Sequence, residues 1–363
     1  MGHNAFDNEQ KALGLAMVDV TVIGAGIFGL SVGYACARRG AKVRLYDDTG
    51  VGAGSSGGLV GALAPHVPER WDEKKEFQFQ SLVMAKEHWC EVDRLSGLTS
   101  GYGRVGRLSP IVSERVLELS YERQEDAREL WHGVAEWRVV ERSQYGAWAP
   151  DSPTGYLVHD TLSARMQPRG AAGSLAGAIQ ALGGEIVVDD PVFKGAVVWA
   201  TGYRGLLALS DEFEVEVGNG VKGQSALLRY DAGDVPQLFD DGIYVVPHQD
   251  GTVAVGSTSE RYFDDPLAVD GLLDDVLQRV FGAFPVLQGA EVLERWAGVR
   301  PRGRKLAPIL GAYPGRDGHF IANGGFKIGF SMAPKVGEVM ADLVLDGNAG
   351  GIPDGFLVEA NLP

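Results

Sequence analysis

A glycine-rich turn near the start of the chain has the residue types and the spacing to bind a dinucleotide. It reads Gly24-Ala25-Gly26-Ile27-Phe28-Gly29. Gly24 permits a tight turn, Gly26 lets the backbone approach a pyrophosphate, and Gly29 lets a helix pack closely on the preceding strand. The N-terminus of that helix offers free N–H groups and a partial positive charge to phosphate oxygens. The turn therefore predicts a dinucleotide site.

An acidic residue follows at a suitable distance. Asp47 lies 23 positions after Gly24, at the predicted end of the next strand. A carboxylate there accepts hydrogen bonds from both ribose hydroxyls and repels a 2′-phosphate, which disfavours NADP. NAD and FAD are both compatible with this part of the sequence.

The elements around the turn are those that such a site needs. The β-branched run from Val18 to Ile23 predicts a buried parallel strand. Residues 27–39 have a helical pattern that stops at Gly40, and Lys42 to Tyr46 predicts a second strand. Together they form one βαβ unit.

The rest of the chain alternates between two kinds of pattern. Charged, aromatic and apolar residues at helical spacing predict two amphipathic helices within 69–141, and further helices are expected over 169–182 and 264–284. Between 221 and 258 the period falls to two, which predicts antiparallel strands. The last segment predicts a strand, a glycine-rich loop that includes residues 329–332, and a helix over 333–345 with Pro334 in its first turn.

Nucleotide-type elements occur in three separate pieces, so we expect two interleaved domains. The dinucleotide-binding domain is predicted over 17–80, 150–220 and 293–363, and the second domain over 81–149 and 221–292. Residues 1–16 read as a tag or a loose extension.

Composition excludes several classes of function. The net charge of −15 argues against nucleic acid and against an anionic membrane surface as partners. No apolar run approaches the roughly 20 residues of a membrane span, and no secretory signal is present. Cys36 and Cys90 form no CxxC pair, and the seven histidines have no metal-ligand spacing. We expect a cytoplasmic protein without a metal site.

A second motif distinguishes between the two dinucleotides. The apolar strand that ends in Ala200-Thr201-Gly202 lies far downstream of the first unit. Its position and its small residues, which let the backbone lie against a dinucleotide, resemble the flavoprotein pattern. Together with the glycine turn, this motif favours FAD.

With these residues the chain resembles the FAD-dependent D-amino-acid oxidase family, and within it the glycine oxidase and sarcosine oxidase branch. The resemblance runs from Val18 to about Asp346. It rests on the order and spacing of motifs: the βαβ unit, "GAGSSGGLVGALAPH", "MQPRGAAGSLAGAIQALGG", "VVWATG", "VKGQ", "IYVVP" with "VGST", "AGVRP", "PILGAYPG" and "GGFKIGFSMAPKVGEVMADLV".

The resemblance implies a fold and a reaction. The fold is α/β: an FAD-binding Rossmann-like domain interleaved with an α+β substrate domain built on an antiparallel sheet. The reaction is oxidation of the C–N bond of a small amino acid, which is glycine, a D-amino acid or an N-alkyl glycine. Hydride passes to flavin N5, and the resulting imine hydrolyses to an oxo acid.

The resemblance also implies site residues. Arg300 in "AGVRP" and Lys327 in "GGFKIGF" are expected to bind the substrate carboxylate, and Tyr244 in "IYVVP" to face the substrate. The loop 329–332 is expected to face the pyrimidine edge of the flavin. FAD contacts are expected at Gly24, Gly26, Ile27, Phe28, Gly29, Asp47, Asp48, Ser55, Ser56, Gly58, Leu59, Ala200, Thr201, Gly202, Gly298, Arg300, Gly325, Phe326, Lys327, Ile328 and Gly329.

The chain departs from the family pattern at two positions. Sarcosine oxidases tether flavin through a cysteine that would fall near Leu306, where this chain has none, so we expect FAD to be bound non-covalently. Sarcosine oxidases also have a lysine near the flavin that assists the reaction with oxygen. Its position falls near Ala254, where this chain has an alanine. One alternative function is therefore an amino-acid or 2-hydroxy-acid dehydrogenase that uses an acceptor other than oxygen. The resemblance also allows tRNA-base demodification, which the negative charge disfavours.

Overall fold

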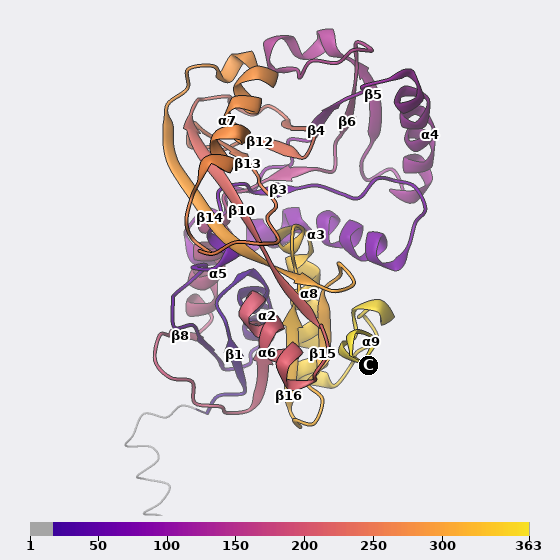
Figure 1. The fold of residues 1–363 in the computed structure, drawn as a ribbon. Coiled ribbons are helices and arrows are strands. Elements are labelled where there is room, and N and C mark those ends of the chain that lie inside the picture. The colour runs from indigo at the N-terminus through magenta and orange to yellow at the C-terminus, as the bar shows by residue number, and fades with distance from the viewer. Residues whose placement is uncertain (1–16, 363) are drawn as a thin grey trace, which may run out of the picture.

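The computed structural model describes residues 17–362 and has two lobes (Figure 1). The extension expected at residues 1–16 lies outside the described residues. Each lobe is built on one large sheet, and the lobes share two long strands, β10 (Gly218–Arg229) and β14 (Val292–Gly303). These strands run diagonally from the upper lobe into the lower one, so residues along them belong to both lobes.

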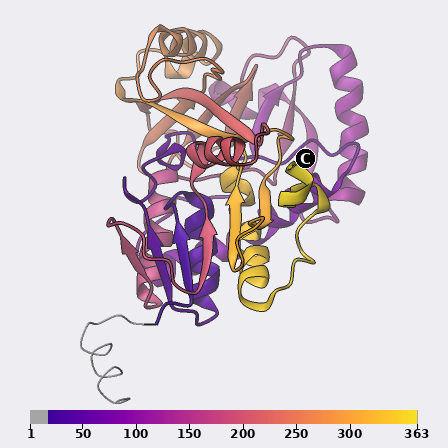
Figure 2. The ribbon, with the colours of Figure 1, turned by 60° about the horizontal axis from the view of Figure 1, so that its bottom comes forward.

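The lower lobe contains a six-stranded sheet, which Figure 2 shows from below. Its strands pair in parallel except for β15 with β16. In sheet order they are β15 (Ile309–Ala312), β16 (His319–Asn323), β9 (Ala196–Trp199), β1 (Val20–Ile23), β2 (Val43–Tyr46) and β8 (Glu185–Val187). The strands predicted around the glycine turn and at "VVWATG" are neighbours in this sheet, because β1 pairs with both β2 and β9.

Helices cover both faces of the six-stranded sheet. The largest hydrophobic cluster joins the sheet to α2 (Ile27–Arg38), α3 (Glu73–Ser96), α5 (Pro168–Ala181) and α8 (Gly329–Asp346). A smaller cluster on the other face joins it to α6 (Gly202–Glu212) and α9 (Val358–Asn361). The carboxyl ends of β1, β9 and β16 therefore emerge from a rigid, fully packed layer.

The upper lobe contains an eight-stranded sheet. In order, its strands are β14, β10, β13 (Thr252–Gly256), β12 (Ile243–Pro247), β11 (Gln237–Asp240), β4 (Arg107–Pro110), β6 (Tyr156–Asp160) and β5 (Trp137–Glu141). The helix α7 (Gly271–Ala283) packs on one face with a second hydrophobic cluster, and α4 (Glu114–Leu130) packs beside β5. A short ribbon of β3 (Ala62–Leu63) and β7 (Ala164–Arg165) completes the strands. This combination of a mainly parallel and a mainly antiparallel sheet confirms the predicted fold class.

Two predicted helix starts were wrong. The final helix begins at Gly329 and not at Ala333, so residues 329–332 form its first turn and Pro334 lies in its interior. Residues 331–334 are buried in the core, and this packing outweighs the backbone hydrogen bond that a proline removes.

The helix expected from Asp264 begins only at Gly271, after the N-cap Asp270. The side chain of Asp265 accepts from the N–H groups of Leu267 and Ala268, and this local turn competes with a helix.

Membrane-spanning helices and groups of metal-binding side chains are both absent from residues 17–362. None of their helices is both long enough and apolar enough to cross a membrane. No group of histidine, cysteine and acidic side chains within that range is arranged to hold a metal ion.

The packing of α8 on α2 generates a first prediction. A Cβ added at Gly337 of α8 would lie 2.7 Å from the Ser31 carbonyl oxygen of α2. Replacing Gly337 with valine should push the helices apart and lower the free energy of unfolding by roughly 1–3 kcal/mol, measured by urea denaturation. The control is Gly173→Ala in α5, where no heavy atom lies within 4 Å, and it should be neutral or stabilising. Equal stability of the two variants would contradict the close contact.

Candidate active site

Three loops converge at the carboxyl ends of β1, β9 and β16. A Cβ added at Gly24 would lie 2.3 Å from the Ala200 carbonyl oxygen, so the glycine turn and the "ATG" turn are in direct contact. The amide of Asn323, at the end of β16, donates to the carbonyl of Gly202 at 2.9 Å. Ligands of open parallel sheets bind in such a crevice outside the strand ends.

The start of α2 is shaped to receive an anion. Its N-cap is Gly26, which provides no side-chain cap, and its first turn contains no acidic residue. Only 3.4 Å separates a Cβ built at Gly26 from the Ser56 hydroxyl oxygen, which itself accepts from the Ile27 N–H at 2.9 Å. The other amides of the first turn and the absence of a side chain at Gly26 fit the pyrophosphate of a dinucleotide.

Asp47 links two loops of this crevice. One carboxylate oxygen accepts from the Ala25 N–H at 2.7 Å, inside the glycine turn. The other accepts from the Thr49 N–H at 2.9 Å, the Thr49 hydroxyl at 2.7 Å and the Gly50 N–H at 3.0 Å. The first oxygen retains a lone pair that can accept from a ribose hydroxyl. Asp48, the next residue, is exposed.

Three other predicted cofactor residues, Gly58, Gly298 and Gly325, contact aromatic rings. Gly325 contacts the ring of Phe28, since a Cβ there would lie 3.0 Å from it. Gly58 and Gly298 both lie against the indole of Trp296, at 3.2 Å and 2.4 Å from a Cβ built on each. These glycines let the loops pack closely on the two aromatic rings. The fit to an extended dinucleotide such as FAD rests on the start of α2 and on Asp47.

The Arg300 side chain lies against the upper sheet, over Gly223 and beside Ser257 and Thr258. Its guanidinium lies directly over Gly223 of β10, where an added Cβ would be 2.1 Å from both terminal nitrogens. It donates to the Ser257 hydroxyl at 2.6 Å and to the Thr258 carbonyl at 3.3 Å. Within residues 17–362 no carboxylate lies within 4.0 Å of it. Arg300 is therefore a cation held only by neutral groups.

Lys327 lies close to this guanidinium although it is 27 positions away in the sequence. The link is a hydrogen bond from the Phe326 N–H to the Pro301 carbonyl at 3.0 Å. Lys327 is exposed as a residue, but partial desolvation of its ammonium lowers its pKa, and the neighbouring Arg300 lowers it further. Burial also lowers the pKa of Arg300, to about 10, although Glu260 acts in the opposite direction. Two neighbouring cations, neither of which has a carboxylate within 4.0 Å among the described residues, form a site that can receive an anion.

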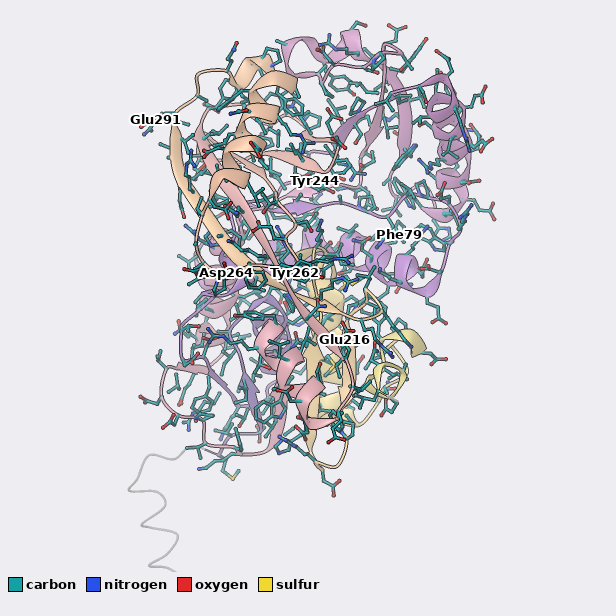
Figure 3. All side chains as sticks on the ribbon, viewed as in Figure 1. Phe79, Glu216, Tyr244, Tyr262, Asp264 and Glu291 are labelled. Atoms are coloured by element: carbon teal, nitrogen blue, oxygen red, sulfur yellow. The ribbon has the colours of Figure 1, made fainter. Side chains whose placement is uncertain are left out.

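Tyr244 lies on the upper lobe, as Figure 3 shows, but its hydroxyl points to a different arginine. Arg107 of β4 donates to it over a long 3.4 Å contact. The Tyr244 backbone is opposite Gly256, which immediately precedes the Ser257 that holds Arg300. Strand β13 lies between Tyr244 on β12 and the Arg300 guanidinium over β10, and Arg107 of β4 lies beyond β11 on the other side of Tyr244.

Four residues of this arrangement were missed by the sequence reasoning. They are Trp296, Gly223, Ser257 and Arg107. "VKGQ" and "VGST" contain two of them and had been noted as motifs, but their roles depend on strand register between distant segments. No local pattern could have revealed them.

A second prediction concerns FAD. Gly26→Val should abolish FAD binding, because the side chain would fill the space for the pyrophosphate and crowd Ser56. FAD content is measured after acid precipitation, which should release the flavin of the unchanged protein into the supernatant. The control Gly282→Val alters a glycine of α7 with no heavy atom within 4 Å of an added Cβ. Colour that stays in the wild-type pellet would contradict non-covalent binding.

A third prediction concerns the position of the Arg300 guanidinium over Gly223. Gly223→Ala should displace the guanidinium and raise KM for an amino-acid substrate by roughly 10- to 100-fold, with FAD content unchanged. Gly282→Ala is the matched control and should leave KM as it is. A Gly223→Ala enzyme with the wild-type KM would show that substrate binding does not depend on the position of the Arg300 guanidinium.

Comparison with known proteins agrees with this geometry. The family model described as FAD dependent oxidoreductase matches residues 19–343. The glycine oxidase of Geobacillus kaustophilus (strain HTA426) is 24% identical in an alignment that covers 90% of this chain and 92% of that protein. A crystal structure of glycine oxidase from Geobacillus kaustophilus has a TM-score of 0.81 at 21% identity, covering 94% and 98% of the two chains.

Two further solved structures have the same fold. Iminodiacetate oxidase from Chelativorans sp. BNC1 has a TM-score of 0.78 at 24% identity, covering 95% of this chain and 98% of that one. L-Proline dehydrogenase from P. horikoshii has a TM-score of 0.78 at 18% identity, covering 96% and 99%. The glycine turn, the "ATG" turn and the match over nearly the whole chain lead to one conclusion: the chain belongs to the DAO family of FAD-dependent oxidoreductases.

Proposed function

We propose that this enzyme oxidises the C–N bond of a small amino acid, either glycine, a D-amino acid or an N-alkyl glycine, to an imine that hydrolyses to an oxo acid. The observation that carries the proposal is the Arg300 guanidinium, which lies over Gly223, has only neutral partners and has Lys327 beside it. A planar guanidinium can pair with a carboxylate through two parallel hydrogen bonds, and a lysine adds a point charge.

Residues of the lower lobe would hold FAD. The amides at the start of α2 would bind the pyrophosphate, Asp47 a ribose, and the first turn of α8 the pyrimidine edge of the flavin. When bound, FAD supplies the acceptor for the hydride that leaves the substrate carbon. It would be held non-covalently, since the two cysteines lie at Cys36 in α2 and Cys90 in α3, far in sequence from Leu306.

The chain's contribution to the reaction is mainly positioning. Arg300 and Lys327 would fix the substrate carboxylate, and this fixes the direction of the bond that breaks at the neighbouring carbon. No general base is needed if the amine binds in its neutral form.

A 2-hydroxy acid has a carboxylate next to its reacting carbon, as an amino acid does, so a substrate screen is required to distinguish the two classes. Loss of flavin absorbance without oxygen, tested with glycine, D-amino acids, N-alkyl glycines and 2-hydroxy acids, identifies the class.

A fourth prediction tests the two cations. Arg300→Ala should raise KM by an amount that corresponds to roughly 2–5 kcal/mol, with unchanged FAD content, because a charge pair with the substrate is lost. Lys327→Ala should also raise KM. Arg304→Ala is the control, since Arg304 lies on the same segment and is exposed. Normal kinetics in both Arg300→Ala and Lys327→Ala, on every amino acid that is oxidised, would refute a carboxylate substrate.

A second candidate is a dehydrogenase that passes electrons to an acceptor other than oxygen. The observation that favours it is Ala254, at the position where the family resemblance would put a lysine. Ala254 is fully buried in β13 between Leu227 and Val246, so no cation extends from this strand position.

The fifth prediction separates the two candidates by stopped-flow mixing of reduced enzyme with oxygen. A dehydrogenase should reoxidise no faster than free flavin, and Ala254→Lys should then increase the rate. Reoxidation of the wild-type enzyme much faster than free flavin would refute the dehydrogenase. Arg304→Ala changes an exposed residue and is the control that should leave the rate unaltered.

A further inference from the structure

A row of side chains crosses one face of the upper sheet from Arg300 toward β4. Residues directly opposite one another in antiparallel strands share a face. The register therefore places on one face Trp296, Ser225, Gly256, Tyr244 and Phe239. The opposite face carries the core beneath α7. The row thus continues the surface on which Arg300 is seated, and Tyr244 lies within it.

Arg107 lies at the end of this row and is a buried cation with a carboxylate partner. Its Nε donates to the Asp160 carboxylate at 2.9 Å, and only 7% of Arg107 and 1% of Asp160 are exposed. Burial lowers the pKa of Arg107, but Asp160 and the Tyr244 oxygen outweigh burial, so the pKa lies above its usual value. The guanidinium stays charged, and its second nitrogen faces the Tyr244 hydroxyl.

The chemistry of the two groups decides which one donates. A guanidinium has five N–H donors and no acceptor, so the Tyr244 oxygen must accept in this contact. The hydroxyl proton is then free to donate elsewhere. Packing limits where it can point, because the Tyr244 ring lies 4.6 Å from the ring of Phe239, which also has Arg107 5.6 Å from its centre.

We propose that Arg107 is a positioning residue that holds the Tyr244 hydroxyl as a donor toward the substrate carboxylate, opposite Arg300. The Arg107–Asp160 pair is itself neutral overall, so it orients Tyr244 without adding a competing net charge to the pocket. This inference rests on the proposed function, because it takes the carboxylate at Arg300 as given. It also implies that the substrate amine, a donor or neutral group, lies away from Tyr244.

The test is a double-variant cycle on the FAD-loaded enzyme. Tyr244→Phe removes the hydroxyl, and Arg107→Lys keeps the charge beside Asp160 but cannot reach both partners. The probe is propionate, a carboxylate without an amine, whose Kd is read from the change in flavin absorbance. Each single variant should raise Kd about tenfold, and the double variant should be no weaker than the single ones. KM for an amino-acid substrate should follow Kd, with kcat changed less.

Several controls keep the outcomes distinct. Arg229→Lys makes the same exchange at an exposed ion pair with Glu291 and should leave Kd unchanged. Additive effects in the double variant, or a wild-type Kd in Arg107→Lys, would overturn the proposal. If Arg107→Lys does not fold, Tyr244→Phe decides, because an unchanged propionate Kd excludes a donor role. Arg300→Ala in the same assay tests the proposed function separately: normal propionate binding there would refute the function itself.

Discussion

The half-buried Arg300 guanidinium has no carboxylate within 4.0 Å among the described residues, and much of the site is organised around this cation. Burying an unpaired charge is costly, and hydrogen bonds to neutral groups offset only part of that cost. Here the Ser257 hydroxyl and the Thr258 carbonyl supply those bonds, and the missing side chain of Gly223 supplies the space. The lowered pKa of Arg300 reflects the remaining imbalance. An anionic ligand bound to the guanidinium would offset the remaining cost of burying this charge.

The two-lobed architecture makes this arrangement compatible with a dinucleotide site. Strands β10 and β14 belong to the upper sheet but extend into the lower lobe, and β14 carries both Trp296 and Arg300. Trp296 contacts Gly58, which belongs to the glycine-rich segment after β2. The loop before α8 is bonded to β14 at Pro301, which brings Lys327 alongside. One strand therefore aligns the candidate substrate clamp with the candidate cofactor crevice.

Local patterns predicted the parts of the molecule that are determined locally. The strand–turn–helix around Gly24 and the period-two strands between 221 and 258 could be read directly, and the structure has them. Helix starts were less predictable. Burial of residues 331–334 extended α8 past Pro334, and the Asp265 turn shortened α7. The contacts of Arg300 with Gly223 and of Tyr244 with Arg107 join segments that are distant in the sequence, so only the strand register reveals them. The predicted domain boundaries and the individual site residues stay predictions.

The most direct measurement is a crystal structure of the FAD-loaded enzyme with a small carboxylate bound. We expect both carboxylate oxygens within hydrogen-bond distance of the terminal nitrogens of Arg300, with Lys327 Nζ close by and the guanidinium still over Gly223. A carboxylate bound elsewhere, with Arg300 unchanged and still bonded only to Ser257 and Thr258, would contradict the assignment of this cation as the substrate anchor.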